Sequence, residues 1–204
     1  MNHSALRILV TGATGQLGHE LARELAPLGR VVATDRHALD LAAPDTIVAA
    51  INAHAPDVIV NAAAYTAVDD AEREPDVAHR INAVAPGILA DVEKPTGALL
   101  IHYSTDNVFD GAQPKPYTED APTHPLNVYG RTKLDGERAI AQSGAAALVL
   151  RTGWVYGRRG RNFLLTMRRL ARERDELRVV VDQHGAPNWS RTLARASARL
   201  IAQG

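Results

Sequence analysis

The stretch LRILVTGATGQLGHELARELAPLG, residues 6–29, decides the fold of this chain. Its first part, LRILVTG, is a short apolar run that ends in glycine, which predicts a buried parallel strand. Its second part, QLGHELARELAPLG at 16–29, carries leucines at helical spacing and ends at a glycine suited to a helix C-cap. A strand that turns through glycines directly into a helix is the opening unit of a βαβ fold.

The turn between this strand and helix, TGATGQLG at 11–18, has the features of a phosphate-binding loop. Gly12, Gly15 and Gly18 follow a G-x-x-G-x-x-G pattern. Glycine allows a tight turn and a close approach of the backbone, and the first amides of the following helix point at a bound pyrophosphate. Because the required strand and helix flank the motif, it predicts a dinucleotide site.

The alternation of strands and helices continues along the chain. Strands that alternate with helices imply a parallel sheet covered on both faces, and right-handed crossovers then produce a doubly wound layout. The expected fold class is α/β, a Rossmann-type doubly wound parallel sheet with helices on both faces. Further strands are predicted at RVVATD (30–35), DVIVNAA (57–63), ALLIHYS (98–104), AALVLRT (146–152) and LRVVVD (177–182). Further helices are predicted at 43–54, within 69–91, around Tyr129, within the arginine-rich run 158–174, and at 188–203.

Composition excludes several classes of protein. The 204 residues are 46% hydrophobic and 23% charged, which is typical of one soluble globular domain. Basic and acidic residues balance at 23 each, so no polybasic field indicates nucleic acid or an anionic membrane as a partner. The lack of cysteine excludes a disulfide framework, a thiol nucleophile and a zinc-thiolate site. Without a charged leader or a run of ~18 apolar residues, we expect a cytoplasmic protein.

The end of the second predicted strand bears on the choice of cofactor. Asp35 follows the glycine loop at the distance where a carboxylate can accept hydrogen bonds from the adenosine ribose, which favours NAD. Arg36 beside it could instead meet the 2′-phosphate of NADP. Asp40 and Leu41 begin the next connection and could border the adenine. These residues leave NADH and NADPH open.

Two later segments supply candidates for catalysis. NVYGRTKLDGE, Asn127 to Glu137, puts Tyr129 and Lys133 on one face of a predicted helix, one turn apart, in a chain with only three lysines. We expect the ammonium to lower the pKa of the phenol and make it a usable acid. HYSTDNVFDG (102–111) follows a strand, so its hydroxyl groups are expected at the carboxyl edge of the sheet, where ligands bind.

Several motifs together resemble the extended short-chain dehydrogenase/reductase superfamily and, within it, the family of dTDP-4-dehydrorhamnose reductases. The similarity covers nearly the whole chain. NAAAYTAVD, STD-x-VF-x-G and RT-x-WVYG are more specific to this family than the glycine loop or Tyr-x-x-x-Lys. The motifs that carry the resemblance are TGATGQLG, VIVNAAAYTAVDDAE, HYSTDNVFDG, PLNVYGRTK, LRTGWVYG and DQHGAP.

The resemblance implies roles for individual positions. The implied catalytic residues are Thr105, Tyr129 and Lys133, and the implied contacts to the sugar nucleotide are Thr105, Asp106 and Trp154. Without the resemblance, a lone tryptophan after a strand would be assigned to core packing. The expected cofactor-binding residues, with the glycines and Arg36 included, are Gly12, Gly15, Gln16, Leu17, Gly18, Asp35, Arg36, Asp40, Leu41, Ala64, Tyr65, Thr66, Tyr103, Tyr129 and Lys133. No metal is expected, because the cofactor supplies the electrons.

The implied reaction is hydride transfer from NADPH or NADH to the C4 carbonyl of dTDP-4-dehydro-L-rhamnose, which gives dTDP-L-rhamnose for polysaccharide biosynthesis. A nucleotide-sugar epimerase or dehydratase and an NAD(P)-binding regulatory or catalytically defective homologue stay open as alternatives. The expected partner is the dTDP-sugar substrate, with a homodimer left open.

Two departures from the family pattern qualify the resemblance. Asn107 stands where the family has an aromatic residue, so we expect an altered substrate pocket. The resemblance implies a C-terminal lobe after the Rossmann domain, and we expect residues 1–204 to contain little of it. Residues 1–204 are therefore expected to form the NAD(P)-binding Rossmann domain with a complete cofactor site.

Overall fold

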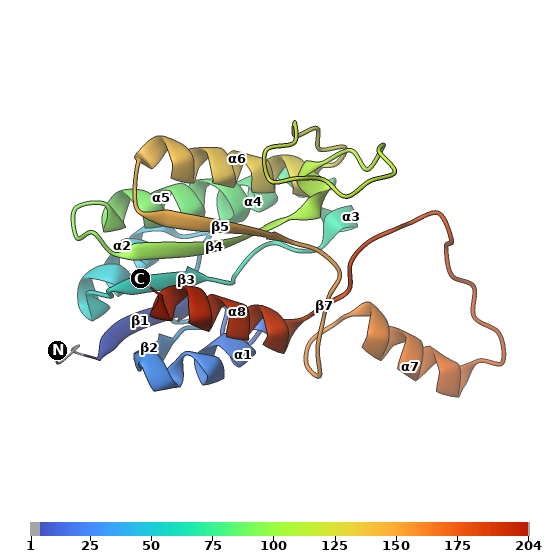
Figure 1. Ribbon diagram of the computed structural model, residues 1–204, viewed down its shortest axis with the longest axis horizontal. Coiled ribbons are helices and arrows are strands. Elements are labelled where there is room, and N and C mark those ends of the chain that lie inside the picture. The colour runs from blue at the N-terminus through green and yellow to red at the C-terminus, as the bar shows by residue number, and fades with distance from the viewer. Residues whose placement is uncertain (1–4, 204) are drawn as a thin grey trace.

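A computed structural model describes residues 5–203 of the chain as a parallel sheet between two layers of helices (Figure 1). The sheet has five strands in the order β2-β1-β3-β4-β5, and every neighbouring pair is parallel. The order reverses between β1 and β3, and in open α/β sheets ligands bind at such a switch point. The Rossmann-type fold prediction is confirmed. The strands are β1 (Leu6–Thr11), β2 (Gly29–Ala33), β3 (Val58–Asn61), β4 (Leu99–Thr105) and β5 (Ala147–Thr152).

Helices connect the strands, and a second pair of very short parallel strands follows the sheet. That pair is β6 (Val155–Tyr156) with β7 (Asn188–Trp189). The α-helices are α1 (Gln16–Glu24), α2 (Pro44–His54), α3 (Val68–Ala71), α4 (Pro75–His79), α5 (Ala85–Glu93), α6 (Val128–Ser143), α7 (Phe163–Glu173) and α8 (Ser190–Ala202). Single turns of other helix types lie at Ala26–Leu28 (η1, 3-10), Arg80–Val84 (η2, π) and Asp106–Val108 (η3, 3-10).

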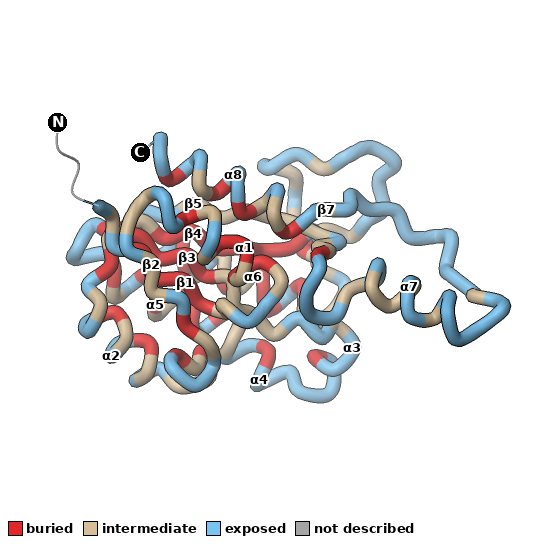
Figure 2. The backbone as a smooth tube through the Cα atoms, turned by 90° about the horizontal axis from the view of Figure 1, so that it is seen from below, coloured by how far each residue is buried: buried red, intermediate tan, exposed pale blue. Residues whose placement is uncertain are grey.

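Alternating side chains of the strands build two separate apolar layers. Ile8 and Val10 of β1 pack with the leucines of α1 and with α8, whereas Leu9 between them packs with α2, α5 and α6 on the opposite face. Successive side chains of a strand point to opposite faces, so a strand in the middle of a covered sheet must be apolar throughout. Figure 2 shows the buried residues concentrated along the strands and the inward sides of these helices.

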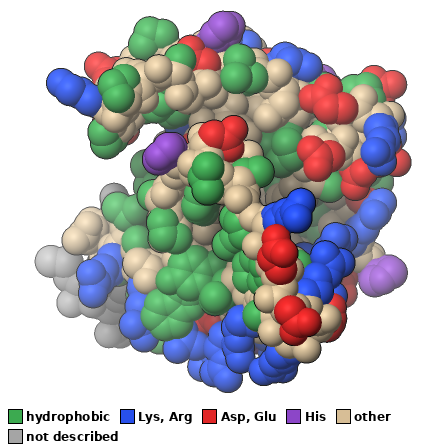
Figure 3. All heavy atoms as spheres, turned by 90° about the vertical axis from the view of Figure 1, so that its right-hand side faces the viewer, with side chains coloured by type: hydrophobic (Ala, Val, Ile, Leu, Met, Phe, Trp, Pro, Cys, Tyr) green, Lys and Arg blue, Asp and Glu red, His purple; other side chains and the backbone are tan. Residues whose placement is uncertain are grey.

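The segment from α7 to β7 lies apart from these layers (Figure 1). A helix was predicted within the arginine-rich run 158–174, and α7 confirms this. No residue of α7 is buried, and Phe163 and Leu164 are exposed within the described chain. Figure 3 shows the face of the molecule that lies on the right in Figure 1. Apolar and arginine side chains gather on the lower part of this face, where Figure 1 places α7.

The predicted strand LRVVVD at 177–182 is wrong. This segment is irregular, and Val179, Val180 and Val181 are 50%, 64% and 90% exposed. Valine-rich runs favour strands because they suit a pleated and covered surface, but this run pairs with no strand among residues 5–203. The sheet ends instead at β5.

The first helix is shorter than predicted, because it ends at Glu24 and the 3-10 turn η1 follows it. Pro27 disfavours helical backbone at the residue before it and removes a hydrogen-bond donor. Gly29 is the first residue of β2 and does not cap an α-helix. A Cβ atom there would lie 2.0 Å from the Leu6 carbonyl oxygen, so glycine is required for β2 to approach β1.

No helix within residues 5–203 is both long and apolar enough to cross a lipid bilayer.

Candidate active site

A cleft of about 780 Å³ lies beyond the carboxyl ends of the sheet strands, and it brings together most of the predicted site residues. Of those eighteen positions, Gly18 and Asp35 are the two that are not among its lining residues. The predicted residues that line it are Gly12, Gly15, Gln16, Leu17, Arg36, Asp40, Leu41, Ala64, Tyr65, Thr66, Tyr103, Thr105, Asp106, Tyr129, Lys133 and Trp154.

The glycine loop forms one wall of the cleft at the start of α1. Gly12 has a left-handed φ of +69°, and its carbonyl oxygen accepts a hydrogen bond from the Gly15 amide at 2.9 Å. Gly15 precedes α1 without a side-chain cap, so the first amides of the helix are left for a ligand. Gly18 packs behind the loop: a Cβ atom on it would lie 2.1 Å from the Gly12 carbonyl oxygen.

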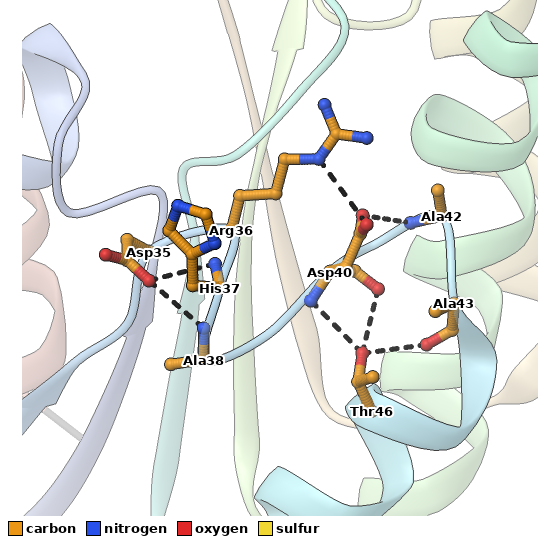
Figure 4. Close-up of polar contacts among 8 residues, drawn as sticks. All are labelled: Asp35, Arg36, His37, Ala38, Asp40, Ala42, Ala43 and Thr46. Carbon is orange, nitrogen blue, oxygen red and sulfur yellow. Dashed lines mark hydrogen bonds and ion pairs between the residues drawn. The ribbon is translucent and has the colours of Figure 1, made fainter.

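In the connection after β2, the neighbouring residues Asp35 and Arg36 make different contacts (Figure 4). The Asp35 carboxylate accepts hydrogen bonds from the backbone amides of His37 and Ala38 at 3.0 and 3.1 Å, so it holds the turn. Arg36 lines the cleft, and its Nε lies 3.4 Å from a carboxylate oxygen of Asp40. The charged group that faces the cleft directly after β2 is therefore a guanidinium.

Tyr65, which lines the cleft with Ala64 and Thr66, is held by an asparagine that was not predicted from the sequence. The side chain of Asn82 accepts from the Tyr65 amide at 2.9 Å and donates to the Tyr65 carbonyl at 3.0 Å. Asn82 is buried in the π-helical turn η2, and such turns are frequent at functional sites. The Tyr65 hydroxyl donates to Glu74 at 2.7 Å, and this hydrogen bond raises the pKa of Tyr65 to about 12.

The predicted proton donor Tyr129 lies in the first turn of α6. Asn127 caps this helix by accepting a hydrogen bond from the Gly130 amide at 2.7 Å. Gly130 packs on the 3-10 turn η3, since a Cβ atom on it would lie 2.2 Å from the Asn107 carbonyl oxygen. This close contact brings the end of β4, with Thr105, against the start of α6.

Asn107, at the position where the family has an aromatic residue, takes part in the hydrogen bonding around Thr105. The Thr105 hydroxyl oxygen accepts from the Asn107 amide at 3.1 Å and from the Asn107 side chain at 3.2 Å. The Asn107 side-chain oxygen in turn accepts from Asn127 at 3.2 Å. The asparagine thus links the hydroxyl group of Thr105 to the cap of the Tyr129 helix.

The expectation that Lys133 lowers the pKa of Tyr129 is wrong for this structure. Burial raises the pKa of Tyr129 above its ordinary value, a hydrogen bond with Thr105 opposes this rise, and the charge of Asp106 adds to it. Desolvation disfavours the phenolate because the charged form loses its water. The phenol therefore stays protonated through neutral pH.

Lys133 is buried below the cleft, with a relative exposure of 1%. Its Nζ donates a hydrogen bond to the Tyr103 carbonyl oxygen at 2.6 Å and lies 3.1 Å from Nε2 of His102. Burial lowers the pKa of Lys133 to about 7, and the charge of Glu137 opposes this fall. The amine consequently exchanges its proton in the physiological range, which was not anticipated from the sequence.

Trp154 has an unusual backbone conformation at the mouth of the cleft. Its φ is +48°, a left-handed value that side chains rarely adopt, and it is 50% exposed. The ring packs on Gly185, where a Cβ atom would lie 2.4 Å from it. Gly153 before it packs on the Asp106 carboxylate. A half-exposed tryptophan held in a strained conformation is not explained by core packing, and such residues cluster at ligand sites.

A family model described as the RmlD substrate binding domain matches residues 6–204. The chain belongs to this family.

Curated relatives are similar to almost the whole of this chain and are longer than it. A protein of Burkholderia thailandensis named dTDP-4-dehydrorhamnose reductase is 52% identical over 197 residues, which are 97% of this chain and 66% of that protein. The protein of that name from Escherichia coli K12 is 48% identical over 200 residues, 96% of this chain and 67% of that protein. This chain therefore spans about two thirds of the length of its relatives.

Solved structures of other proteins are also similar to the structure of this chain. A dTDP-4-dehydrorhamnose reductase from Bacillus anthracis in complex with NADP is 37% identical, with a TM-score of 0.93, over 97% of this chain and 70% of that one. UDP-glucose 4-epimerase from Thermus thermophilus in complex with NAD has a TM-score of 0.81 at 20% identity, over 96% of this chain and 74% of that one. At that identity the second match indicates only a shared fold.

Part of the cleft wall in this family member comes from the arginine-rich run 158–174, for which only a helix was predicted from the sequence. Arg161, just before α7, lines the cleft beside the glycine loop. Gln16 donates to the Arg161 carbonyl oxygen at 3.3 Å and accepts from the Asn162 side chain at 2.8 Å. The available signal was Asn162, a helix-capping residue type directly after a glycine and arginine pair.

Proposed function

We propose that this chain is a dTDP-4-dehydrorhamnose reductase that uses a reduced nicotinamide cofactor to convert dTDP-4-dehydro-L-rhamnose into dTDP-L-rhamnose. The observation that carries the proposal is one cleft that unites a glycine loop with Thr105, Tyr129 and Lys133. The names of the curated relatives support the substrate. A homodimer stays a prediction.

The residues of the cleft fit a dinucleotide. Its volume of about 780 Å³ lies within the range of small-molecule sites. The uncapped start of α1 offers amides to a pyrophosphate, and Arg36 and Asp40 border the region beyond the glycine loop where an adenosine would lie. When bound, the reduced nicotinamide supplies the hydride.

The chain's own residues would handle the proton of the reaction. Tyr129 is protonated at neutral pH because burial raises its pKa, so its phenol can give a proton to the oxygen of the sugar carbonyl as that oxygen becomes an alkoxide. The Thr105 hydroxyl, held by Asn107, can hydrogen-bond the same oxygen. Lys133 can return a proton to the phenolate.

Turnover tests the proposal directly. With purified protein, NADPH and dTDP-4-dehydro-L-rhamnose, the absorbance of the reduced nicotinamide should fall, and dTDP-L-rhamnose should accumulate in equal amount. A matched reaction without the sugar controls for oxidation of NADPH alone. Conversion of the 4-keto sugar into an isomer without net loss of NADPH would indicate an epimerase-type internal cycle, and binding of NADPH without turnover would indicate a binding protein. Either result would contradict the reductase.

We further propose that the site prefers NADPH to NADH, because Arg36 faces the cleft whereas the Asp35 carboxylate is engaged by backbone amides. The Arg36→Ala variant should bind NADPH about tenfold more weakly and NADH unchanged, since a hydrogen bond to a charged group contributes about 1.5–3 kcal/mol. Fluorescence titration with both cofactors measures this.

Arg73→Ala is the matched control. Arg73 and Arg36 have nearly equal side-chain exposure, 79% and 78%, and each is paired with an aspartate. Arg73 is not among the residues that line the cleft, so its loss should change neither affinity. Equal weakening of NADPH and NADH by the Arg36 variant would contradict the proposed contact with the 2′-phosphate.

A further inference from the structure

A row of polar side chains crosses the sheet beneath the cleft. Thr11 of β1, Asn61 of β3 and His102 of β4 are neighbours in the strand register. The Thr11 hydroxyl lies 2.6 Å from Oδ1 of Asn61, and Nδ2 of Asn61 lies 3.1 Å from Nδ1 of His102. Nε2 of His102 then lies 3.1 Å from Nζ of Lys133. The four side chains form one continuous hydrogen-bonded chain that ends at Lys133.

This row stands out from the strand positions around it. Residues of the same strands that point to the same face, such as Leu9, Ile59 and Leu100, are apolar and belong to the core. Each member of the row is at most 1% exposed. Burying polar side chains costs free energy that apolar residues would not cost, and hydrogen bonds offset this only when every partner is in place. A structural role alone does not require an imidazole at this position.

The chemistry of imidazole explains why histidine suits the position beside Lys133. A neutral imidazole has one nitrogen that donates and one that accepts. If Asn61 donates to Nδ1, the proton sits on Nε2, which donates to the neutral amine of Lys133. If Lys133 is an ammonium, it donates to Nε2, and the proton on Nδ1 is donated to the oxygen of a turned Asn61 amide. The Thr11 hydroxyl can donate to the oxygen of that amide or accept from its nitrogen.

We propose that His102, oriented by Asn61, is a positioning residue that anchors the Lys133 amine below the cofactor site and offers it a hydrogen-bond partner in both of its protonation states. The inference rests on the proposed function, because it concerns the proton that Tyr129 gives up in the reduction. That proton passes to the substrate oxygen, Lys133 as an ammonium gives one proton to the phenolate, and Lys133 becomes the amine. His102 accommodates the amine without leaving a buried donor or acceptor unpaired.

The charges around Lys133 are consistent with this role. Glu137, one turn further along α6, is paired with Arg151 of β5 at 2.7 Å, so its charge is partly neutralised. The phenol of Tyr103 on β4 points to Ser197 of α8 on the other face of the sheet. His102 is fully buried, and burial together with the charge of Lys133 holds its pKa well below the usual range, so the imidazole is neutral.

Two variants separate this role from simple packing. His102→Leu removes both hydrogen-bonding nitrogens, whereas His102→Gln keeps an amide that can donate to or accept from Lys133. The chain has only three lysines, so the Lys133 signal can be assigned in a 13C-lysine NMR spectrum by comparison with Lys94→Arg and Lys115→Arg variants. The spectrum gives the pKa of Lys133 as a function of pH without any substrate.

We expect Lys133 of the unaltered chain to titrate near pH 7. In His102→Leu its pKa should fall further, because the ammonium loses an acceptor. At pH 7, kcat should fall by about 10- to 100-fold, since a displaced catalytic group costs roughly this much. The loss of kcat in His102→Leu should be smaller at pH 6 than at pH 8, because Lys133 loses its ammonium form as the pH rises. His102→Gln should restore most of the kcat.

A titration that is the same in His102→Leu as in the unaltered chain would overturn the proposal, even if the variant is less stable. An ordinary lysine pKa in the unaltered chain would also overturn it. Because the titration needs no substrate, it is independent of the turnover assay. Failure of the unaltered chain to reduce the sugar would contradict the proposed function and leave the effect of His102 on Lys133 to be decided by NMR.

Discussion

The Tyr129→Phe variant is expected to lose reductase activity by about 10²- to 10⁴-fold while it still binds NADPH. In the proposed mechanism the phenol hydroxyl protonates the substrate oxygen, and burial keeps it in the protonated form that can do so. Phenylalanine keeps the ring that packs in the wall of the cleft, so the cofactor should bind with nearly unchanged affinity. Steady-state turnover and fluorescence titration with NADPH measure the two quantities on the same preparation.

Tyr117→Phe serves as its control. The Tyr117 hydroxyl donates to Asp110 at 2.5 Å, outside the cleft, and its ring stacks on Phe109. This variant also loses one tyrosine hydroxyl, but turnover should be unchanged. If Tyr129→Phe keeps its turnover, another group supplies the proton and the mechanism is wrong. If it also loses NADPH binding, its effect on turnover cannot be assigned to the proton.

The second large effect is expected at Gly18, where alanine should disrupt the glycine loop. Its Cβ atom would lie 2.1 Å from the Gly12 carbonyl oxygen and 3.0 Å from Cα of Ala13. These are backbone atoms, so the clash can be relieved only if α1 moves away from the end of β1. We expect the free energy of unfolding to fall by about 3 kcal/mol, in the range of severe overpacking, and NADPH affinity to be lost. Thermal unfolding with and without NADPH measures both.

Gly97→Ala separates this clash from the general cost of replacing a glycine. Gly97 has a left-handed φ of +73°, and an added Cβ atom there would meet nothing within 4 Å. Gly97→Ala should lower the free energy of unfolding by only about 1–2 kcal/mol, through backbone strain, and should leave NADPH affinity unchanged. A Gly18→Ala protein that NADPH still stabilises fully against heat would show that the close packing of the loop is not needed for binding.

Much of the fold could be predicted because its signals are local. Apolar runs of strand length, leucines at helical spacing and glycines between them predicted all five strands of the main sheet and the helices between them. The same signals failed at 177–182. A valine-rich run has the same local preference whether or not a neighbouring strand is available, and only the arrangement of the whole sheet decides that.

The candidate site was predictable where its residues are close in sequence or follow a strand. The glycine loop, Thr105 and the Tyr129–Lys133 pair were expected together, because the carboxyl ends of parallel strands share one edge. Asn82 and Arg161 were missed, since neither directly follows a strand of the main sheet or belongs to a recognised motif. Asn82 acts through Tyr65, and Arg161 lines the cleft from the segment before α7. The expected contact of Asp35 with the cofactor stays a prediction; Oδ1 of its carboxylate accepts hydrogen bonds from two amides of the turn that follows it.

The class of fold, the glycine loop and the types of side chain available for chemistry follow from the amino-acid sequence alone, because they depend on residue type and on short spacings. The protonation of these side chains depends on how the folded chain surrounds them. Tyr129 and Lys133 are one helical turn apart, yet burial raises the pKa of the first and lowers that of the second to about 7. The hydrogen-bonded row that ends at Lys133 comes from β1, β3 and β4, which contribute Thr11, Asn61 and His102. Desolvation and hydrogen bonding depend on everything packed around a group, and no short stretch of sequence contains that information.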